Sequence, residues 1–135
     1  MSAFEILCVT MHQRDFSKIE EMNIHSDVLF ANQSDRTELT QMRFESHRAR
    51  MITTDTRGVG KNRNLVLTYA EGDICLFADD DVVYQDDMEQ RILAEFEAYP
   101  DADIIVFHLK STDKTRVPGG YKRTRKVRFW ERMPW

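Results

Sequence analysis

The sequence is poor in cysteine and has no long apolar run, and each absence excludes a class of protein. The two cysteines, Cys8 and Cys75, each lie inside a short apolar segment, which predicts buried thiols rather than a disulfide framework. No Cys/His spacing suggests a zinc site. No apolar run approaches the roughly 20 residues that span a bilayer, and residues 1–5 do not look like a signal peptide. We therefore predict a cytoplasmic protein.

Charge is unevenly distributed along the 135 residues, a length that suits one domain. Residues 1–109 carry 10 Lys/Arg against 21 Asp/Glu, or −11, whereas residues 110–135 carry 9 against 2, or +7. A basic tail of this kind suits anionic lipid at the inner face of a membrane or a phosphorylated substrate, but a plain solvated tail or the cut end of a larger protein is the favoured interpretation. The tail lacks the aromatic spacing of a stacking platform, so we expect no nucleic acid partner.

Apolar segments that alternate with helical patterns predict an α/β protein. Right-handed crossovers between such segments imply a three-layer α/β/α arrangement around a mainly parallel sheet. The alternation over 40–45 predicts a strand that turns at 46–47, and a helix over 37–47 is the competing interpretation. The other expected strands cover 4–10, 27–31, 49–54, the run that enters Asp79, and 103–109; the expected helices cover 16–22, 57–70 and 86–99.

Polar residues cluster in the loops that follow the expected strands. A strand order of 3-2-1-4, in which the strand over 49–54 is the third, would align the loops 11–15, 32–36, 57–63 and 79–82 along one edge of the sheet. That concurrence carries more weight than any single motif.

Three consecutive aspartates, Asp79, Asp80 and Asp81, follow a continuous apolar run. Such a run is typical of a strand buried on both faces, and parallel sheets carry their chemistry at the carboxyl ends of strands. Adjacent acids repel each other unless a cation or hydrogen-bond donors balance them. Asp79 and Asp81 are two residues apart and suit one Mg²⁺ or Mn²⁺ ion. The alternative is that the acids merely solvate the end of the strand.

A glycine-rich segment, Arg57-Gly58-Val59-Gly60-Lys61-Asn62-Arg63-Asn64, opens one of the expected helices. Glycines at a helix entrance let backbone N–H groups approach an anion, which the helix dipole also favours. Arg57, Lys61 and Arg63 add positive charge. The spacing fits neither GxxxxGK[ST] nor GxGxxG, and an exposed helix start with ordinary surface cations is the alternative.

Taken together, these segments resemble the nucleotide-sugar-binding half of family 2 glycosyltransferases with the GT-A fold. The order and spacing agree over roughly residues 4–109, and the Gly-x-Gly-x-x-Arg-Asn helix start followed by a GD-strand-DxD is fairly specific as a combination. The matching pieces are the strand ending in Val9-Thr10, the loop Asn32-Gln33-Ser34-Asp35, the segment 57–64, Ala70-Glu71-Gly72-Asp73, and Phe77-Ala78-Asp79-Asp80-Asp81-Val82.

The resemblance implies a site for a UDP- or GDP-sugar donor. Asp79 and Asp81 would hold the Mg²⁺ or Mn²⁺ ion, and the arginines would face the base or the diphosphate. Asn32 stands where the family usually has an aspartate that reads the base, so Asp35 is a candidate for that role. The expected donor-binding residues are Thr10, His12, Asn32, Asp35, Arg57, Gly58, Lys61, Arg63, Asp79, Asp80 and Asp81.

The resemblance also implies an inverting transfer to a glycan or lipid-linked acceptor. A cation and arginines would stabilise the departing diphosphate, and a carboxylate would deprotonate the acceptor hydroxyl. In the family that base lies in the C-terminal half, and after residue 109 only Asp113 and Glu131 are acidic. We assign no base. We expect a truncated GT-A fold, with a donor-binding domain over 1–109 and a basic start of a missing acceptor region over 110–135, that binds donor but transfers sugar poorly alone.

Two other functions fit parts of the pattern. Asp79-Asp80-Asp81-Val82-Val83 matches the DxDx[TV] motif of haloacid-dehalogenase-like phosphatases, with Asp79 as nucleophile and Asp81 as general acid. That motif normally ends the first strand of its domain, whereas here at least three expected strands precede it. A non-catalytic module that only binds a sugar nucleotide is the second alternative, since the base is what is missing.

Overall fold

The computed structural model describes residues 4–113 and 123–128. The chain divides into two compact units, Met1–Ala98 and Tyr99–Trp135. Residues 114–122 and 129–135 of the expected basic tail lie outside the described residues. None of the described helices is long and apolar enough to cross a bilayer.

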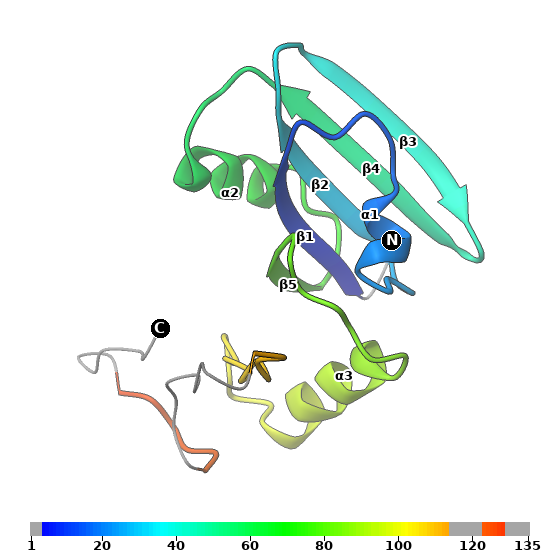
Figure 1. Cartoon of the computed structure of the whole chain (residues 1–135). Coiled ribbons are helices and arrows are strands. Elements are labelled where there is room, and N and C mark those ends of the chain that lie inside the picture. The colour runs from blue at the N-terminus through cyan, green and yellow to red at the C-terminus, as the bar shows by residue number, and fades with distance from the viewer. Residues whose placement is uncertain (1–3, 114–122, 129–135) are drawn as a thin grey trace. The chain divides into compact units, whose positions relative to one another are not determined.

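The first unit is built on one five-stranded sheet with the order β3-β4-β2-β1-β5 (Figure 1). Strands β1, β2, β4 and β5 run parallel, and β3 pairs antiparallel with β4. This confirms the expected strand order and the hairpin, and the competing helix over 37–47 is wrong. The strands are β1 (Phe4–Met11), β2 (Val28–Gln33), β3 (Glu38–Phe44), β4 (His47–Thr54) and β5 (Ile74–Asp79); the helices are α1 (Lys18–Glu21), α2 (Val59–Thr68) and α3 (Met88–Ala98).

The sheet is covered on both faces because its central strands carry apolar side chains on both sides. On one face, Leu7, Val9 and Leu29 pack with Val66 of α2. On the other, Phe30 and its neighbours pack with the Met22 end of α1 and with α3. Continuous apolar strands are typical of parallel sheets enclosed in this way. The three-layer α/β/α arrangement expected from the sequence is therefore confirmed.

A buried ion pair fastens the connection between α2 and β5 to the sheet. Arg50 donates to Glu5 Oε1 over 2.7 Å, and Glu5 and Arg50 are 2% and 9% exposed. The other oxygen of Glu5 accepts the backbone N–H groups of Glu71 and Gly72. A Cβ atom on Gly72 would lie 2.8 Å from Glu5 Cβ, so only glycine fits there. Burying these charges is tolerable because both are paired and hydrogen-bonded.

Two expectations about local structure need correction. The first helix is shorter than the expected 16–22 and covers only Lys18–Glu21, while Asp15 accepts the N–H of Ser17 over 2.9 Å just before it. The expected strand over 103–109 is wrong, because the structure assigns no strand there and Ile104 is 77% exposed. An apolar run forms a strand only when a neighbour satisfies its backbone groups, and composition does not report that.

The two arginines on β4 provide a matched test of the buried ion pair. Replacement of Arg50 by methionine leaves Glu5 buried and uncompensated, so it should lower the free energy of unfolding by about 3–5 kcal/mol. Arg48 also contacts Glu71 but is more exposed, at 36% of its side chain, and Arg48→Met should cost about 1 kcal/mol or less. Denaturant unfolding followed by circular dichroism measures both changes. Equal losses in the two variants would contradict this role for Arg50.

Candidate functional site

The carboxyl ends of the four parallel strands meet at one edge of the sheet and bring the polar loops together. The chain leaves β1 toward α1 on one face, whereas the crossover from β4 to β5 passes through α2 on the other face. The connections thus diverge between β1 and β5, and ligands of open α/β sheets bind in the crevice at such a point. Thr10 and the three aspartates lie at this edge, as the strand order predicted.

On the β2 side of the edge, Asn32 is saturated by the protein itself. Its carbonyl oxygen accepts the N–H of Gln13, and its amide donates to the carbonyl of Gln13 and to Thr53 Oγ1, all within 3.1 Å. Asn32 is 1% exposed. An amide with these bonds holds the loop after β1 in place and has little left to offer a nucleobase. Gln13 and Thr53 were not expected from the sequence, since nothing local to either residue marks this pairing.

The loops that flank Asn32 expose His12 and Asp35 and leave Arg36 half-buried. His12 adopts a left-handed backbone with φ 55° and its N–H donates to the carbonyl of Gln33. Arg36 donates to the Gln13 carbonyl over 3.1 Å. The Ser34 hydroxyl donates to the Asp35 carboxylate and lowers the pKa of that carboxyl. Asp35 is exposed and charged, so it stays available for the base-reading role that the sequence suggested for it.

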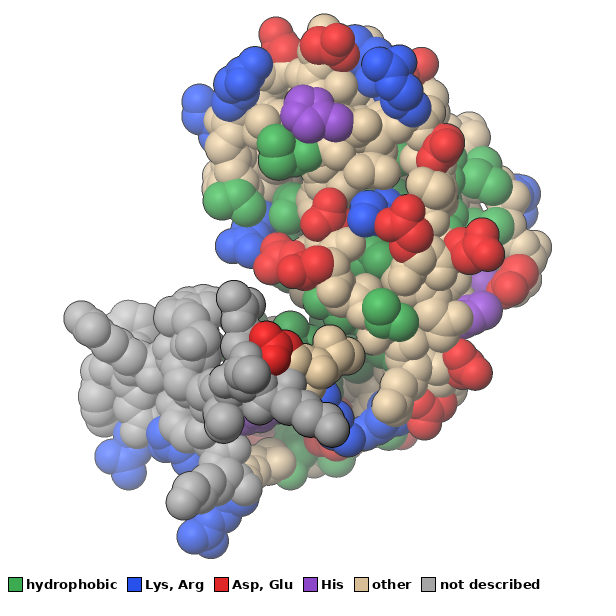
Figure 2. Space-filling model, in the orientation of Figure 1, with side chains coloured by type: hydrophobic (Ala, Val, Ile, Leu, Met, Phe, Trp, Pro, Cys, Tyr) green, Lys and Arg blue, Asp and Glu red, His purple; other side chains and the backbone are tan. Residues whose placement is uncertain are grey.

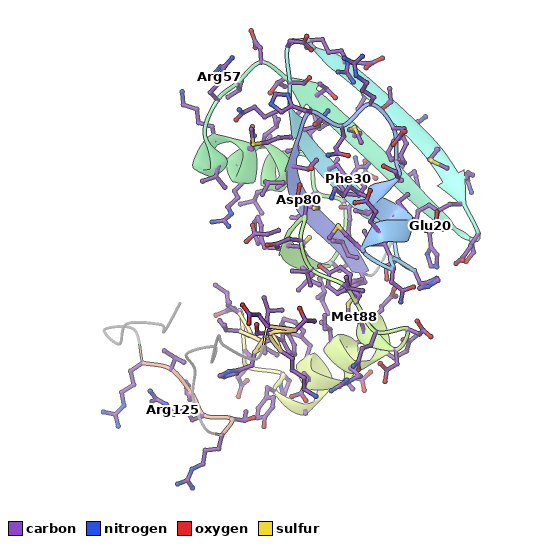
Figure 3. All side chains as sticks on the ribbon, in the orientation of Figure 1. Glu20, Phe30, Arg57, Asp80, Met88 and Arg125 are labelled. Carbon is purple, nitrogen blue, oxygen red and sulfur yellow. The ribbon has the colours of Figure 1, made fainter. Side chains whose placement is uncertain are left out.

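The α2 entrance is shaped by Gly58, whose φ of 115° is rarely adopted by residues with a side chain. Its N–H donates to Gln33 Oε1 over 3.0 Å, which joins the start of α2 to the end of β2. Arg57 and Lys61 are exposed, and no hydrogen bond or ion pair joins either to another described side chain. Figure 3 shows Arg57 on the loop that precedes α2.

The aspartates at the end of β5 point to opposite faces of the sheet. Asp79 accepts a hydrogen bond from Arg63 of α2 over 3.0 Å. Asp80 accepts one from the Thr10 hydroxyl over 2.6 Å on the α1 face. Asp79 and Asp81 are exposed, whereas Asp80 is half-buried. Successive side chains of a strand alternate between its faces, so one ion could not draw on Asp79 and Asp80 equally.

The buried thiol of Cys8 and the half-buried phenol of Tyr84 lie near the acidic loop. Burial, together with the nearby Asp80 and Asp79, raises the pKa of Cys8 to about 12. Burial also raises the pKa of Tyr84. Both groups are therefore neutral at physiological pH and add no negative charge to the acidic strand end.

The carboxylates at the end of β5 fit a hard divalent cation only as part of a larger coordination shell. Among the described residues, no group of three or more His, Cys, Asp or Glu side chains is placed to hold a metal ion. Mg²⁺ and Mn²⁺ commonly use one or two carboxylates and complete their shell with water and substrate phosphates. Exposed Asp79 and Asp81 match that donor set, and neither is sequestered in the core.

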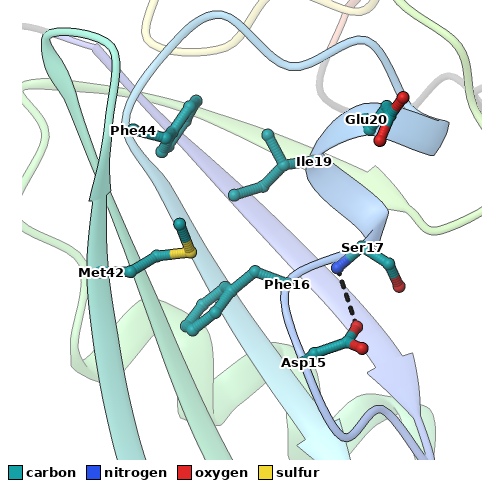
Figure 4. Close-up of a pocket in the computed structure, with 7 residues that line it drawn as sticks. All are labelled: Asp15, Phe16, Ser17, Ile19, Glu20, Met42 and Phe44. Carbon is teal, nitrogen blue, oxygen red and sulfur yellow. Dashed lines mark hydrogen bonds between the residues drawn. The ribbon is translucent and has the colours of Figure 1, made fainter.

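Two hollows elsewhere on the first unit do not belong to this edge. One, of about 400 Å³, lies between the α1 segment and β3, where Phe16, Ile19, Met42 and Phe44 point toward one another (Figure 4). The other, of about 850 Å³, is lined mainly by charged residues that include Asp27, Arg43 and Glu71. Neither is lined by an expected donor-binding residue. Acidic and basic side chains both occur on the face of the first unit that Figure 2 shows.

Comparison with protein families gives an observation that is independent of the fold. The family described as Glycosyl transferase family 2 matches residues 27–134. The chain belongs to glycosyl transferase family 2. Its mainly parallel sheet with helices on both faces agrees with the GT-A-like fold of that family, and membership implies a glycosyltransferase that uses a nucleotide-sugar donor and an acceptor. A search of curated proteins and a search of solved structures returned no match.

The thiols of this family 2 protein test the burial beneath the acidic loop. Cys8 is 0% exposed, whereas Cys75 is partly exposed. Burial raises the pKa of both thiols, that of Cys8 to about 12, and Cys75 is the more accessible of the two, so we expect an aromatic disulfide reagent to modify Cys75 first. In a Cys75→Ser variant, Cys8 should react only as the chain unfolds in guanidinium. Rapid reaction of the folded Cys75→Ser variant at pH 8 would show that the acidic loop does not cover Cys8.

Proposed function

We propose that the chain provides the donor side of a metal-assisted, inverting glycosyltransferase that takes a UDP- or GDP-sugar. The observation that supports this most strongly is the Arg63–Asp79 contact, which brings the cationic α2 start and the acidic end of β5 to the same edge of the sheet. All the expected donor-binding residues also fall within the Met1–Ala98 unit. A diphosphate and a divalent cation would be balanced by the two charge types found there.

The Arg63–Asp79 pair is well suited to exchange partners when a donor arrives. Its side chains are 49% and 60% exposed, and exposed pairs of this kind contribute about 0–1 kcal/mol. Arg63 can therefore turn from Asp79 to a diphosphate oxygen at little cost. The freed Asp79 carboxylate, with Asp81, would then hold the cation.

The proposed roles follow from how charge changes as the glycosidic bond breaks. A Mg²⁺ or Mn²⁺ ion, when bound, supplies a Lewis acid that neutralises the diphosphate leaving group. Asp79 and Asp81 orient that ion, and Arg63 donates hydrogen bonds to the same negative charge. Interactions that strengthen as negative charge develops lower the barrier to transfer. Arg57, before α2, and Lys61, in its first turn, are exposed and add positive potential, and neither is paired with another side chain that the structure describes.

The acceptor in this proposal is a glycan or a lipid-linked sugar, met at the cytoplasmic face of a membrane. The support is the charge pattern, because the seven excess positive charges of residues 110–135 favour an anionic surface. Family membership favours transfer over the phosphatase chemistry that the DxDx[TV] pattern also allowed. A non-catalytic sugar-nucleotide module would bind donor in the same way, so turnover by a chain that also carries an acceptor-binding region would distinguish the two.

Donor binding can be measured by calorimetry with UDP and GDP, in the presence of Mn²⁺ and after its removal by a chelator. We expect one of the two nucleotides to bind only with Mn²⁺. Asp79→Asn and Asp81→Asn should each weaken that binding by about tenfold or more, because each removes a charged ligand. Asp73 is an exposed aspartate that precedes β5, at the other end of the strand, and Asp73→Asn is the matched control that should bind normally. Failure of both nucleotides to bind with Mn²⁺ would overturn the proposal.

Arg63 offers a second, independent test of the same arrangement. Arg63→Gln should weaken Mn²⁺-dependent nucleotide binding by about three- to tenfold, with a smaller dependence on salt than the unmodified chain, since a diphosphate contact is lost. Arg91 lies on α3 and contacts Gln85, so Arg91→Gln is the control with the same change of charge. Equal effects of the two substitutions would point to net charge and not to a contact at the site.

A further inference from the structure

The middle aspartate of the triplet is held differently from its two neighbours. Asp80 is half-buried, and Asp79 and Asp81 are exposed. Val9 of β1 stands opposite Asp79, the last residue of β5, so Thr10 lies beside Asp80, which begins the turn after β5. This register places the Thr10 hydroxyl 2.6 Å from Asp80 Oδ2. The contact joins the end of β1 to the residue that follows β5, where the chain connections diverge.

The Thr10 hydroxyl that donates this hydrogen bond is held in place by the core. Thr10 is 3% exposed and follows the buried Cys8 and Val9 along β1. Its hydroxyl has one short, charge-assisted bond, and such bonds are stronger than those between neutral groups. Because β1 cannot shift without disturbing both neighbouring strands, the position of Asp80 is set by the most rigid part of the sheet.

Further hydrogen bonds join the loop 80–84 to α1 and to the two residues that follow it. Lys18 Nζ donates to the Asp80 carbonyl over 3.4 Å. Farther along, the Tyr84 N–H donates to the Met22 carbonyl, and Asn23 donates to the Tyr84 carbonyl, both over 2.9 Å. Residues 80–84 are therefore tied at both ends, and Asp80 is the member whose side chain reaches β1.

We propose that Asp80 is a positioning residue, whose hydrogen bond with Thr10 fixes the loop so that Asp79 and Asp81 present their carboxylates to a metal-bound diphosphate. This inference rests on the proposed donor site. The three consecutive aspartates then have different roles. Asp79 and Asp81 present negative charge to the ligand, and Asp80 accepts the hydrogen bond from Thr10 of β1.

The proposal separates the charge of Asp80 from its acceptor oxygen. Asp80→Asn keeps an oxygen that can accept the Thr10 hydrogen, and Asp80→Ala removes it. Thr10→Ser keeps the hydroxyl, and Thr10→Val removes it at similar volume. If the bond positions the loop, Asp80→Ala and Thr10→Val should each weaken Mn²⁺-dependent UDP or GDP binding by about three- to tenfold. Asp80→Asn should bind at least about threefold more tightly than Asp80→Ala, and Thr10→Ser at least about threefold more tightly than Thr10→Val, while the double variant Thr10→Val/Asp80→Ala should be no weaker than either of its single parents.

The opposite pattern would identify a metal ligand instead. If Asp80→Asn binds as poorly as Asp80→Ala while Thr10→Val binds normally, then the charge of Asp80 is what matters and the inference is overturned, although the donor site stands. If Asp80→Ala does not fold, the Thr10→Val and Thr10→Ser pair decides the question, because equal binding by these two also overturns it.

A measurement without nucleotide keeps this inference distinct from the proposed function. Hydrogen exchange of the backbone amides of residues 80–84 in the unliganded chain should accelerate in Asp80→Ala and Thr10→Val by about three- to tenfold, and should change little in Asp80→Asn. Unchanged exchange in the first two variants would overturn the positioning role whatever the nucleotide result. Accelerated exchange in a chain that binds neither nucleotide would leave the Thr10–Asp80 coupling intact and remove only the donor site.

Discussion

Burial of β1 on both faces is the constraint on which the remaining features depend. Its residues from Phe4 to Thr10 are enclosed between β2 and β5 and between the helical layers. Its first acid, Glu5, fastens the connection that leads into β5. Its last buried residue, Thr10, reaches the loop that leaves β5. Contacts with β1 therefore hold both the connection that enters β5 and the loop that leaves it. Buried central strands of a parallel sheet are the elements that open least readily.

Asp79 ends β5 and Asp80 begins the turn after it, and their side chains meet partners on opposite faces of the sheet. Asp79 faces the cations of α2, and Asp80 faces the hydroxyl of β1. Placing all three acids on one face would concentrate repulsion that the described side chains do not offset. Alternation distributes the charge, and it leaves the exposed Asp79 and Asp81 on the outside.

Several parts of the fold followed from the sequence because they depend on local patterns. The apolar runs that end in Thr10, Ala31 and Asp79 identified the parallel strands, and the loop composition at their ends indicated the functional edge. The partners Gln13 and Thr53 of Asn32 could not be predicted, since they depend on how β1, β2 and β4 align. The run over 103–109 has the same composition as the true strands, and only a neighbouring strand distinguishes the two cases.

The outer strand β3 has a consequence for how the molecule behaves in a crowded solution. It forms one margin of the sheet, so one row of its peptide groups faces away from β4. An open margin of this kind invites pairing with another chain, especially beside an apolar side chain such as Leu39, which is 71% exposed. Glu38 and Arg43 place a charge near each end of β3. Charged residues at the edge of a sheet discourage strand-to-strand aggregation, so these two side chains hinder the addition of a strand from another molecule to β3.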